Sequence, residues 1–144
     1  MGSSGTRNAR PPMKVMLDTH LWWWWITGRP GPSAAQRRLL TRIGPDEPAL
    51  LSDISLWEIA MLVSHGRLSI SVPLREWLEG ATAPPLVRRC PISPAVAAAV
   101  AELPESFHRD PADRLIVATA QVHGATLLTQ DARITRSKLV ATVQ

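Results

Sequence analysis

The stretch Asp110–Asp131, DPADRLIVATAQVHGATLLTQD, carries the clearest structural signals in the 144-residue chain. Its first residue is a typical N-cap, and Pro111 suits the first helical position, where no backbone N–H is required. Gly124 is a typical helix stop, so a helix is predicted over Asp110–His123. The apolar run Ala125–Thr129 then reads as a short buried strand. A helix leading directly into a buried strand is typical of a βαβ unit.

The same alternation extends toward the N-terminus. Gly and Pro clusters separate short apolar runs from amphipathic segments, and they mark the ends of the predicted elements. Strands are predicted at Met13–Leu17, Ala49–Ser52, Leu86–Cys90 and Leu139–Val143, and helices at Ala34–Ile43, Ile54–His65, Leu74–Leu78 and Pro94–Leu103. Strands that alternate with helices indicate an α/β fold with three α/β/α layers around a mostly parallel sheet of four to five strands.

Composition and length are those of one globular domain. Hydrophobic residues make up 45% and charged residues 19% of the chain, which excludes a disordered protein. Residues 1–12, MGSSGTRNARPP, read as a disordered leader or expression tag, which leaves 13–144 as a single domain. Cys90 has no partner for an internal disulfide, and no apolar run is long enough to span a bilayer. A cytoplasmic location is therefore predicted.

Four acidic residues fall near the ends of predicted elements: Asp18, Glu58, Asp113 and Asp131. Ligands of open parallel sheets bind beyond the carboxyl ends of the strands, where these acids are expected to converge. Closely packed carboxylates repel one another, and a divalent cation relieves that repulsion. Hard oxygen ligands favour Mg²⁺ or Mn²⁺, which lower the pKa of bound water and neutralise charge on a phosphate.

Each acid also has a purely structural interpretation. Ser55-Leu56-Trp57-Glu58 fits a capping box, in which Glu58 only returns a hydrogen bond to the backbone of Ser55. Asp110 is explained by its role as N-cap, whereas Asp113 is less well explained because one acid already serves that cap. Asp131 fits a turn residue or the N-cap of a short following segment. Asp18 is hardest to explain structurally, because an isolated buried carboxylate is very costly.

Two further groups of residues have competing interpretations. The four consecutive tryptophans Trp22–Trp25 favour core and dimer-interface packing over a base-stacking platform, and on a helix they cannot all be buried in one subunit. Net charge is +4 and is compatible with a polyanionic partner without proving one. Arg109 and Arg114 are candidate phosphate contacts or ordinary surface arginines. The four histidines lack metal-ligand spacing, and His20 is predicted to pack beside the site.

Taken in order, four motifs resemble those of VapC-type PIN domains, and they cover nearly the whole chain from Met13. They are Met13–His20 (MKVMLDTH), Ser52–Ala60 (SDISLWEIA), His108–Arg114 (HRDPADR) with Ala118–Ala120 (ATA), and Leu127–Asp131 (LLTQD). VapC proteins are the toxins of type II toxin–antitoxin pairs. The departure from the usual pattern is Trp22–Trp25, where mixed aliphatic and aromatic residues are more typical.

The resemblance implies a PIN-like fold and an endoribonuclease that hydrolyses RNA with water activated by Mg²⁺ or Mn²⁺, giving a 5′-phosphate and a 3′-hydroxyl. It places the family's catalytic acids on Asp18, Glu58, Asp113 and Asp131. We expect Asp18 and Asp113 to be the principal metal ligands, Glu58 and Asp131 to act directly or through water, and Asp110 to be secondary. It also implies that Thr129 supports the fourth acid. We expect Arg114 and Arg109, together with Thr129, to contact the substrate. A homodimer and a VapB-like antitoxin that covers the site are implied as partners.

The sequence gives less support to other functions. A catalytically inactive PIN-fold module that binds RNA or protein is the main alternative, and the complete set of acids argues against it. A haloacid-dehalogenase-type phosphatase would require Asp-x-Asp after the first strand, but His20 occupies the second position. A receiver domain would require an acidic pair and a late lysine on a strand, which are not evident. No P-loop is present.

Overall fold

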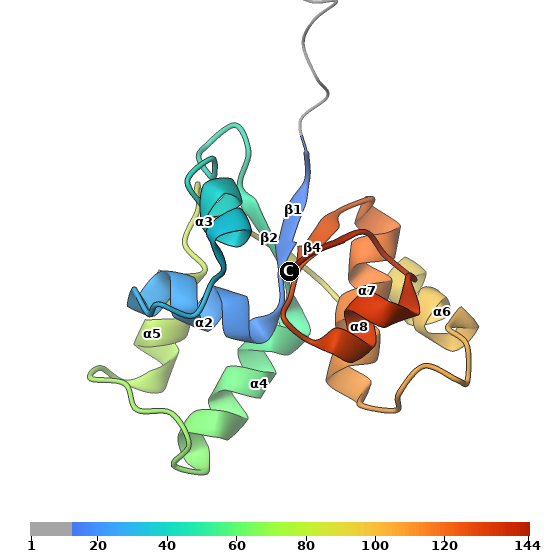
Figure 1. Ribbon diagram of the computed structural model, residues 1–144. Helices are drawn as coiled ribbons and strands as arrows, with labels where there is room; N and C mark the ends of the chain where they lie inside the picture. Colours follow the sequence, from blue (N-terminus) through green and yellow to red (C-terminus); the bar gives the residue numbers. More distant parts are fainter. Residues whose placement is uncertain (1–12) are drawn as a thin grey trace, which may run out of the picture.

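The computed structural model describes residues 13–144, and the predicted leader, residues 1–12, lies outside the described residues (Figure 1). Helices and strands alternate along this part of the chain. The strands are β1 (Val15–Leu17), β2 (Ala49–Ser52), β3 (Val87–Cys90), β4 (Thr126–Leu128) and β5 (Thr142–Val143), and the helices are α2 (Thr19–Thr27), α3 (Ala34–Leu40), α4 (Asp53–Ser64), α5 (Leu74–Ala81), α6 (Pro94–Glu102), α7 (Pro111–His123) and α8 (Ala132–Ser137).

The five strands form one sheet in the order β3-β2-β1-β4-β5, and every neighbouring pair is parallel. The central strand β1 pairs with β2 on one side and with β4 on the other, so that Met16 lies level with Leu50 and Leu127. The predicted α/β class and parallel sheet are confirmed. Because the strands are parallel, β1, β2 and β4 all end at the same edge of the sheet.

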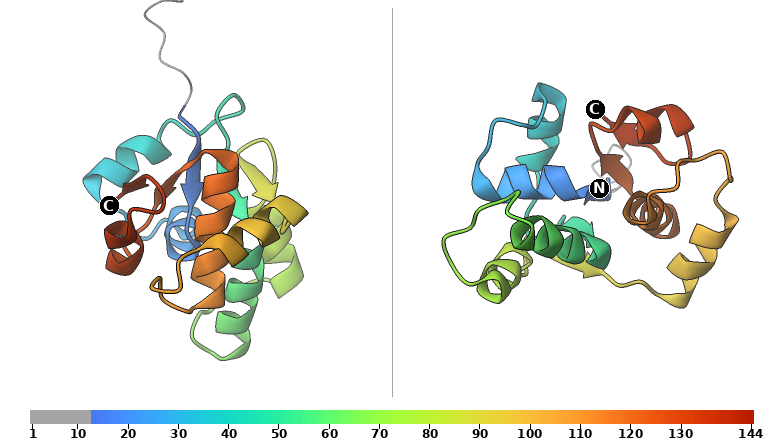
Figure 2. Two further views of the ribbon diagram at one scale, coloured as in Figure 1. Left: turned by 90° about the vertical axis from the view of Figure 1, so that its right-hand side faces the viewer. Right: turned by 90° about the horizontal axis from the view of Figure 1, so that it is seen from below.

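Helices cover both faces of the sheet, which completes the three predicted layers (Figures 1 and 2). Strand residues alternate between the faces, as the two-residue period of a strand requires. Met16 packs in a core cluster with residues of α6 and α7, whereas Val15 and Leu17 pack in a second cluster with residues of α2 and α5. Strands buried on both faces explain why they read as continuous apolar runs.

The tryptophans of α2 divide between core and surface, as the helical geometry requires. Trp22 is fully buried, and its indole N–H donates to the backbone oxygen of Ala81 at 2.9 Å. Trp22 and Trp23 both pack against Trp77 of α5, with ring centroids 5.3 and 5.2 Å apart. Trp24 and Trp25 are only half-buried. The expectation that not all four tryptophans are buried is confirmed, and α2 is thereby fixed against α5.

The predicted elements are recovered with small shifts of their ends. The helix after Ser33 stops at Leu40 instead of Ile43, and the helix after Pro73 continues to Ala81 instead of Leu78. Helix α8 was not predicted as an element, although its N-cap is Asp131, one of the two structural roles considered for that residue. Across the described residues, no helix has the length and apolar character needed to cross a membrane.

Candidate metal centre

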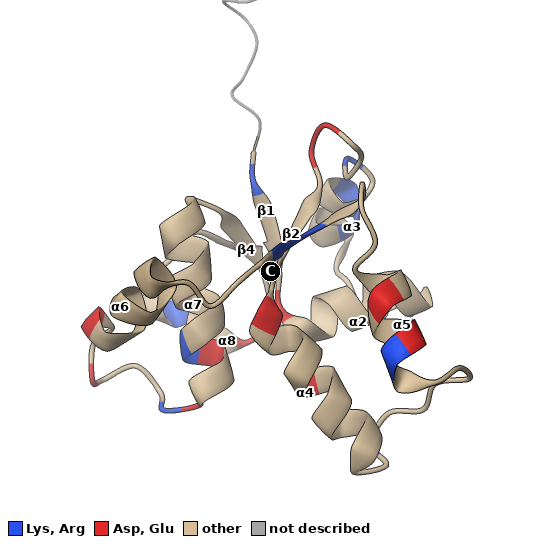
Figure 3. Ribbon diagram, turned by 180° about the vertical axis from the view of Figure 1, so that it is seen from behind, with Lys and Arg blue, Asp and Glu red and all other residues tan. Residues whose placement is uncertain are grey.

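A pocket of about 370 Å³ lies where the carboxyl ends of β1 and β4 meet the first turns of α2, α7 and α8. Acidic positions gather at this end of the strands, on α4 and α7 among other elements (Figure 3). All four predicted acids and the secondary candidate Asp110 line this one pocket. Its lining residues are Asp18, Thr19, His20, Leu21, Trp24, Glu58, Asp110, Asp113, Ile116, Gln130, Asp131 and Arg133.

Asp18 follows β1 directly and is the N-cap of α2. One of its carboxylate oxygens accepts a hydrogen bond from the backbone N–H of Leu21 at 2.9 Å. The residue is only 9% exposed. Burial raises the pKa of the Asp18 carboxyl, and hydrogen bonds from Thr129 and Leu21 offset only part of that effect. A buried acid with a raised pKa is a carboxylate that a nearby cation would stabilise strongly.

Glu58 lies on α4 and faces the start of α2. The Thr19 hydroxyl donates to its carboxylate, and the same hydroxyl lies 2.9 Å from the Ser55 hydroxyl. The capping box considered as the structural alternative for Glu58 is not formed, because the N-cap of α4 is Ser52, three residues before Ser55. Ser55 and Glu58 therefore lie on the inner side of α4 and bind Thr19. Burial raises the pKa of Glu58, and the Thr19 hydrogen bond lowers it only in part.

Asp113 lies in the first turn of α7, just after the cap formed by Asp110. Asp110 accepts hydrogen bonds from the backbone of Ala112 and Asp113 at 2.9 and 3.2 Å, which confirms its predicted capping role. Burial, followed by the charges of Asp110, Asp131 and Glu58, raises the pKa of Asp113 to about 7. At Asp113 the repulsion between neighbouring carboxylates therefore adds to the effect of burial on the pKa.

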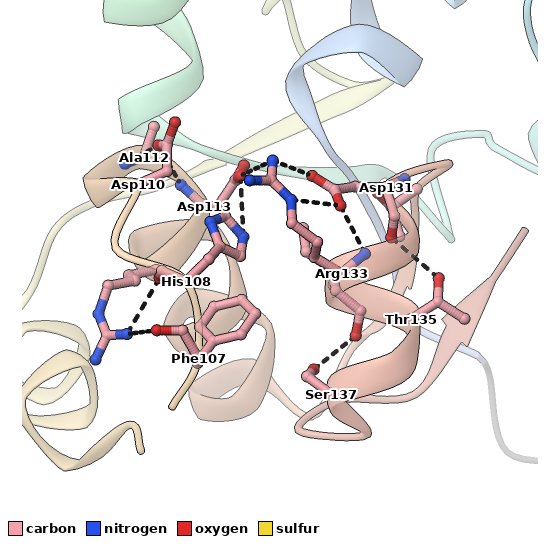
Figure 4. Close-up of polar contacts among 12 residues, drawn as sticks. Phe107, His108, Asp110, Ala112, Asp113, Asp131, Arg133, Thr135 and Ser137 are labelled. Atoms are coloured by element: carbon pink, nitrogen blue, oxygen red, sulfur yellow. Dashed lines mark hydrogen bonds and ion pairs between the residues drawn. The ribbon is translucent and has the colours of Figure 1, made fainter. Parts of the chain in front are cut away.

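Asp131 follows β4 and caps α8 by accepting from the backbone N–H of Arg133 at 2.8 Å. Burial alone would raise the pKa of Asp131, but the hydrogen bonds from Arg133 outweigh it and lower the value. The Arg133 guanidinium donates from Nη2 to Asp131 at 3.1 Å and lies 3.9 Å from Asp113 (Figure 4). One arginine therefore lies between two of the candidate metal ligands.

Thr129 joins the acids of β1 and β4. Its side chain accepts from the backbone N–H of Asp131 at 3.0 Å and hydrogen bonds with Asp18. The fully buried Gln36 of α3 holds this segment in turn, since its amide donates to the backbone oxygens of Thr129 at 3.1 Å and Val143 at 2.9 Å. The ends of β1 and β4 are thus fixed relative to each other by buried hydrogen bonds.

The donor set fits a hard divalent cation. One ligand atom each from His108, Asp113 and Asp131 lies within 4.8 Å of the others. Both ring nitrogens of His108 are buried and have no hydrogen-bond partner among residues 13–144, and Nε2 lies 3.3 Å from a carboxylate oxygen of Asp113. Five carboxylates line the pocket, so a bound ion would relieve their mutual repulsion. Asp18 lines the same pocket outside this group of three, and its pairing with Asp113 on one ion stays a prediction.

The two arginines predicted to bind substrate lie elsewhere. The Arg114 guanidinium donates to backbone oxygens of the preceding loop, including that of Phe107 at 3.0 Å, and stands over the Phe107 ring. Arg109 is exposed and lines a separate surface pocket with Glu105 and Arg114. Neither lines the acidic pocket, and their contact with substrate stays a prediction. His20 lines the pocket but is exposed, in contrast to its expected packing.

Two residues beside these acids were not identified from the sequence, namely Arg133, which lines the pocket, and His108, which lies against Asp113. The spacing of His108 from Asp113 does not match a helical or zinc-ligand pattern, because a loop and a helix cap separate them. Arg133 follows Asp131 by two residues in the sequence. This short spacing could have indicated an ion pair between the two side chains at the N-terminus of α8. Their positions depend on how α7 and α8 pack against β4, which local sequence does not encode.

Comparisons with known proteins agree with this geometry. The model of the PIN domain family matches residues 15–138, and the chain belongs to the PIN domain family. It is 39% identical over 120 residues to Ribonuclease VapC22 of Mycobacterium tuberculosis, covering 83% of this chain and 88% of that protein.

Solved structures with the same fold include FitAcB from Neisseria gonorrhoeae, at 26% identity and a TM-score of 0.64, with 90% of this chain and 96% of that chain covered. A toxin–antitoxin complex from Klebsiella pneumoniae has a TM-score of 0.63 at 17% identity, with 91% and 97% covered. At that identity the likeness shows the fold alone. The resemblance to PIN domains deduced from four short motifs is confirmed.

Proposed function

We propose that this protein is a divalent-metal-dependent endoribonuclease that acts as the toxin of a VapBC-type pair. The observation that carries the proposal is the convergence of Asp18, Glu58, Asp113 and Asp131, from four separate segments, on one pocket. The ribonuclease activity named for the relative at 39% identity supports RNA as the substrate.

The residues of the pocket and its surroundings have distinct roles in holding the ion. Asp113 and Asp18 are the principal ligands of Mg²⁺ or Mn²⁺, with Asp131 and Glu58 acting directly or through water. The bound ion supplies charge neutralisation at a phosphate and a lowered pKa for water. Thr19 orients Glu58, and Thr129 orients Asp18 and the backbone of Asp131. His108 is a further donor beside Asp113 that sequence reasoning had excluded.

The partners that we propose follow from the same class of protein. A VapB-like antitoxin covers the pocket and places a basic side chain among its acids, and the toxin is a homodimer. The excess of carboxylates in the pocket would favour such a basic side chain.

A catalytically inactive binding module remains the second candidate. The raised pKa values of Asp18, Glu58 and Asp113 argue against it, because burying so many acids together is costly unless a cation uses them. A module that only bound RNA, which is itself negatively charged, would gain no affinity from carboxylates at this edge of the sheet.

The discriminating experiment is cleavage of single-stranded RNA in the presence of Mg²⁺ or Mn²⁺ by wild type and Asp18→Asn. We expect the substitution to lower cleavage by at least about 100-fold, because it removes a charge that holds the ion. The matched control is Asp46→Asn, an exposed acid outside the pocket, which should cleave like wild type. Equal cleavage by wild type and Asp18→Asn would contradict the proposal.

A further inference from the structure

Arg133 is the only lysine or arginine among the lining residues of the acidic pocket in the described part of the chain. Its Nη2 lies 3.1 Å from Asp131 and 3.9 Å from Asp113, and its Nε lies 3.3 Å from the other oxygen of Asp131. Both partners are proposed metal ligands. The guanidinium therefore stands among oxygens that would otherwise face a divalent ion (Figure 4).

A guanidinium and a divalent ion cannot both bind these oxygens without strong repulsion between the two cations. Hence Arg133 competes with the ion for Asp113 and Asp131. An arginine that is displaced from them keeps its charge and its planar set of N–H donors, which suit a phosphate. It would also remain beside the pocket that the proposed RNA substrate enters.

The fold leaves this side chain free to move. The Arg133 side chain is 57% exposed, so turning it away costs little buried area. Helix α8 is anchored instead by the fully buried Ile134 and is capped by Asp131 through the backbone N–H of Arg133. Neither contact requires the guanidinium to stay on the carboxylates.

We propose that Arg133 is a substrate-phosphate clamp. It rests on Asp113 and Asp131 in the metal-free protein and turns to an RNA phosphate when a divalent ion takes its place. The inference rests on the proposed function, because it requires both an ion and RNA in this pocket. The Arg133 guanidinium is then a positively charged group that this chain itself supplies to the site, in addition to any that a partner protein brings.

The test compares Arg133→Gln with the matched control Arg136→Gln on the next turn of α8. Arg136 is exposed and does not line the acidic pocket. Calorimetric titration with Mn²⁺ alone measures ion affinity, and steady-state cleavage of single-stranded RNA at saturating Mn²⁺ measures KM across a series of salt concentrations. Arg133→Lys, which keeps the charge but not the planar donors, is the second variant. Arg133→Met, which also removes the charge, takes the place of Arg133→Gln if that protein fails to fold.

We expect Arg133→Gln to bind Mn²⁺ roughly 3- to 10-fold more tightly, because a competing cation that is partly screened by solvent is removed. We expect its KM for RNA to rise about 10-fold and the slope of log KM against log salt to decrease by about 0.7, the value for one lost phosphate contact on a single strand. Arg133→Lys should raise KM less and keep the salt slope. Arg136→Gln should behave like wild type.

A purely structural role for Arg133 would weaken ion and RNA binding together, so unchanged or weaker Mn²⁺ affinity in Arg133→Gln would overturn the inference. An unchanged salt slope would overturn it as well. These results are distinct from failure of the proposed function, which would appear as a wild type that neither binds Mn²⁺ nor cleaves RNA.

Discussion

At the scale of the residue, the pocket is defined by unbalanced negative charge. Asp113 shows this most clearly, because burial and three neighbouring acids raise its pKa to about 7. Its unfolded value is near 3.8. Between these two values the folded state binds a proton that the unfolded state releases, so the contribution of Asp113 to stability falls as pH rises and is fully lost above about pH 7.

We therefore expect Asp113→Asn to be more stable than wild type at pH 8 in EDTA, by roughly 2–4 kcal/mol, and to differ little at pH 4.5. The reason is that asparagine mimics the neutral carboxyl at every pH. Urea unfolding of both proteins at several pH values measures the difference. A stability difference that is the same at pH 4.5 and pH 8 would show that Asp113 does not titrate with a raised pKa.

At the scale of the element, α3 fixes the edge of the sheet that carries the site. Gln36 is fully buried on α3, and its amide oxygen accepts from the backbone N–H of Ser33 at 3.0 Å and from the side chain of Gln130 at 3.1 Å. Its amide N–H groups bind the backbone at the ends of β4 and β5. A single side chain thus connects α3 to the segment that bears Thr129.

Gln36→Ala is expected to lower the free energy of unfolding by roughly 2–4 kcal/mol, because it leaves several buried polar groups without partners. Gln121→Ala is the matched control, since Gln121 also donates to a backbone oxygen, that of Leu139 at 2.9 Å, but is exposed. The control should lose less than about 1 kcal/mol. Urea unfolding compares the two, and equal losses would contradict a special role for Gln36.

Elements with local signals could be predicted from the sequence. The cap Asp110 and the stop Gly124 defined α7 to within one residue, and the apolar run at Ala49–Ser52 defined β2. Glu58 was harder, since its spacing from Ser55 fits a capping box equally well. Only the packing of α4 against Thr19, 39 residues away in sequence, decides between the two roles.

At the scale of the whole molecule, the site exists because the parallel sheet brings the carboxyl ends of β1, β2 and β4 to one edge. Asp18 and Asp131 follow neighbouring strands, and this adjacency was predictable from the strand pattern together with the general rule for open sheets. The placement of His108 and Arg133 was not predictable, because it depends on the packing of a loop and a short helix against that edge. The sequence thus predicted where the acids meet but not the cations and donors between them.

The central claim is that these acids hold a divalent ion, and a crystal structure grown with Mn²⁺ tests it most directly through anomalous scattering. We predict an anomalous peak inside the pocket, bound by oxygens of Asp113 and at least one of Asp18 and Asp131, at ligand distances of about 2.0–2.4 Å. In that structure the Arg133 guanidinium should have left the two aspartates. A pocket without a peak at saturating Mn²⁺, in crystals where its carboxylates are well ordered, would contradict the account.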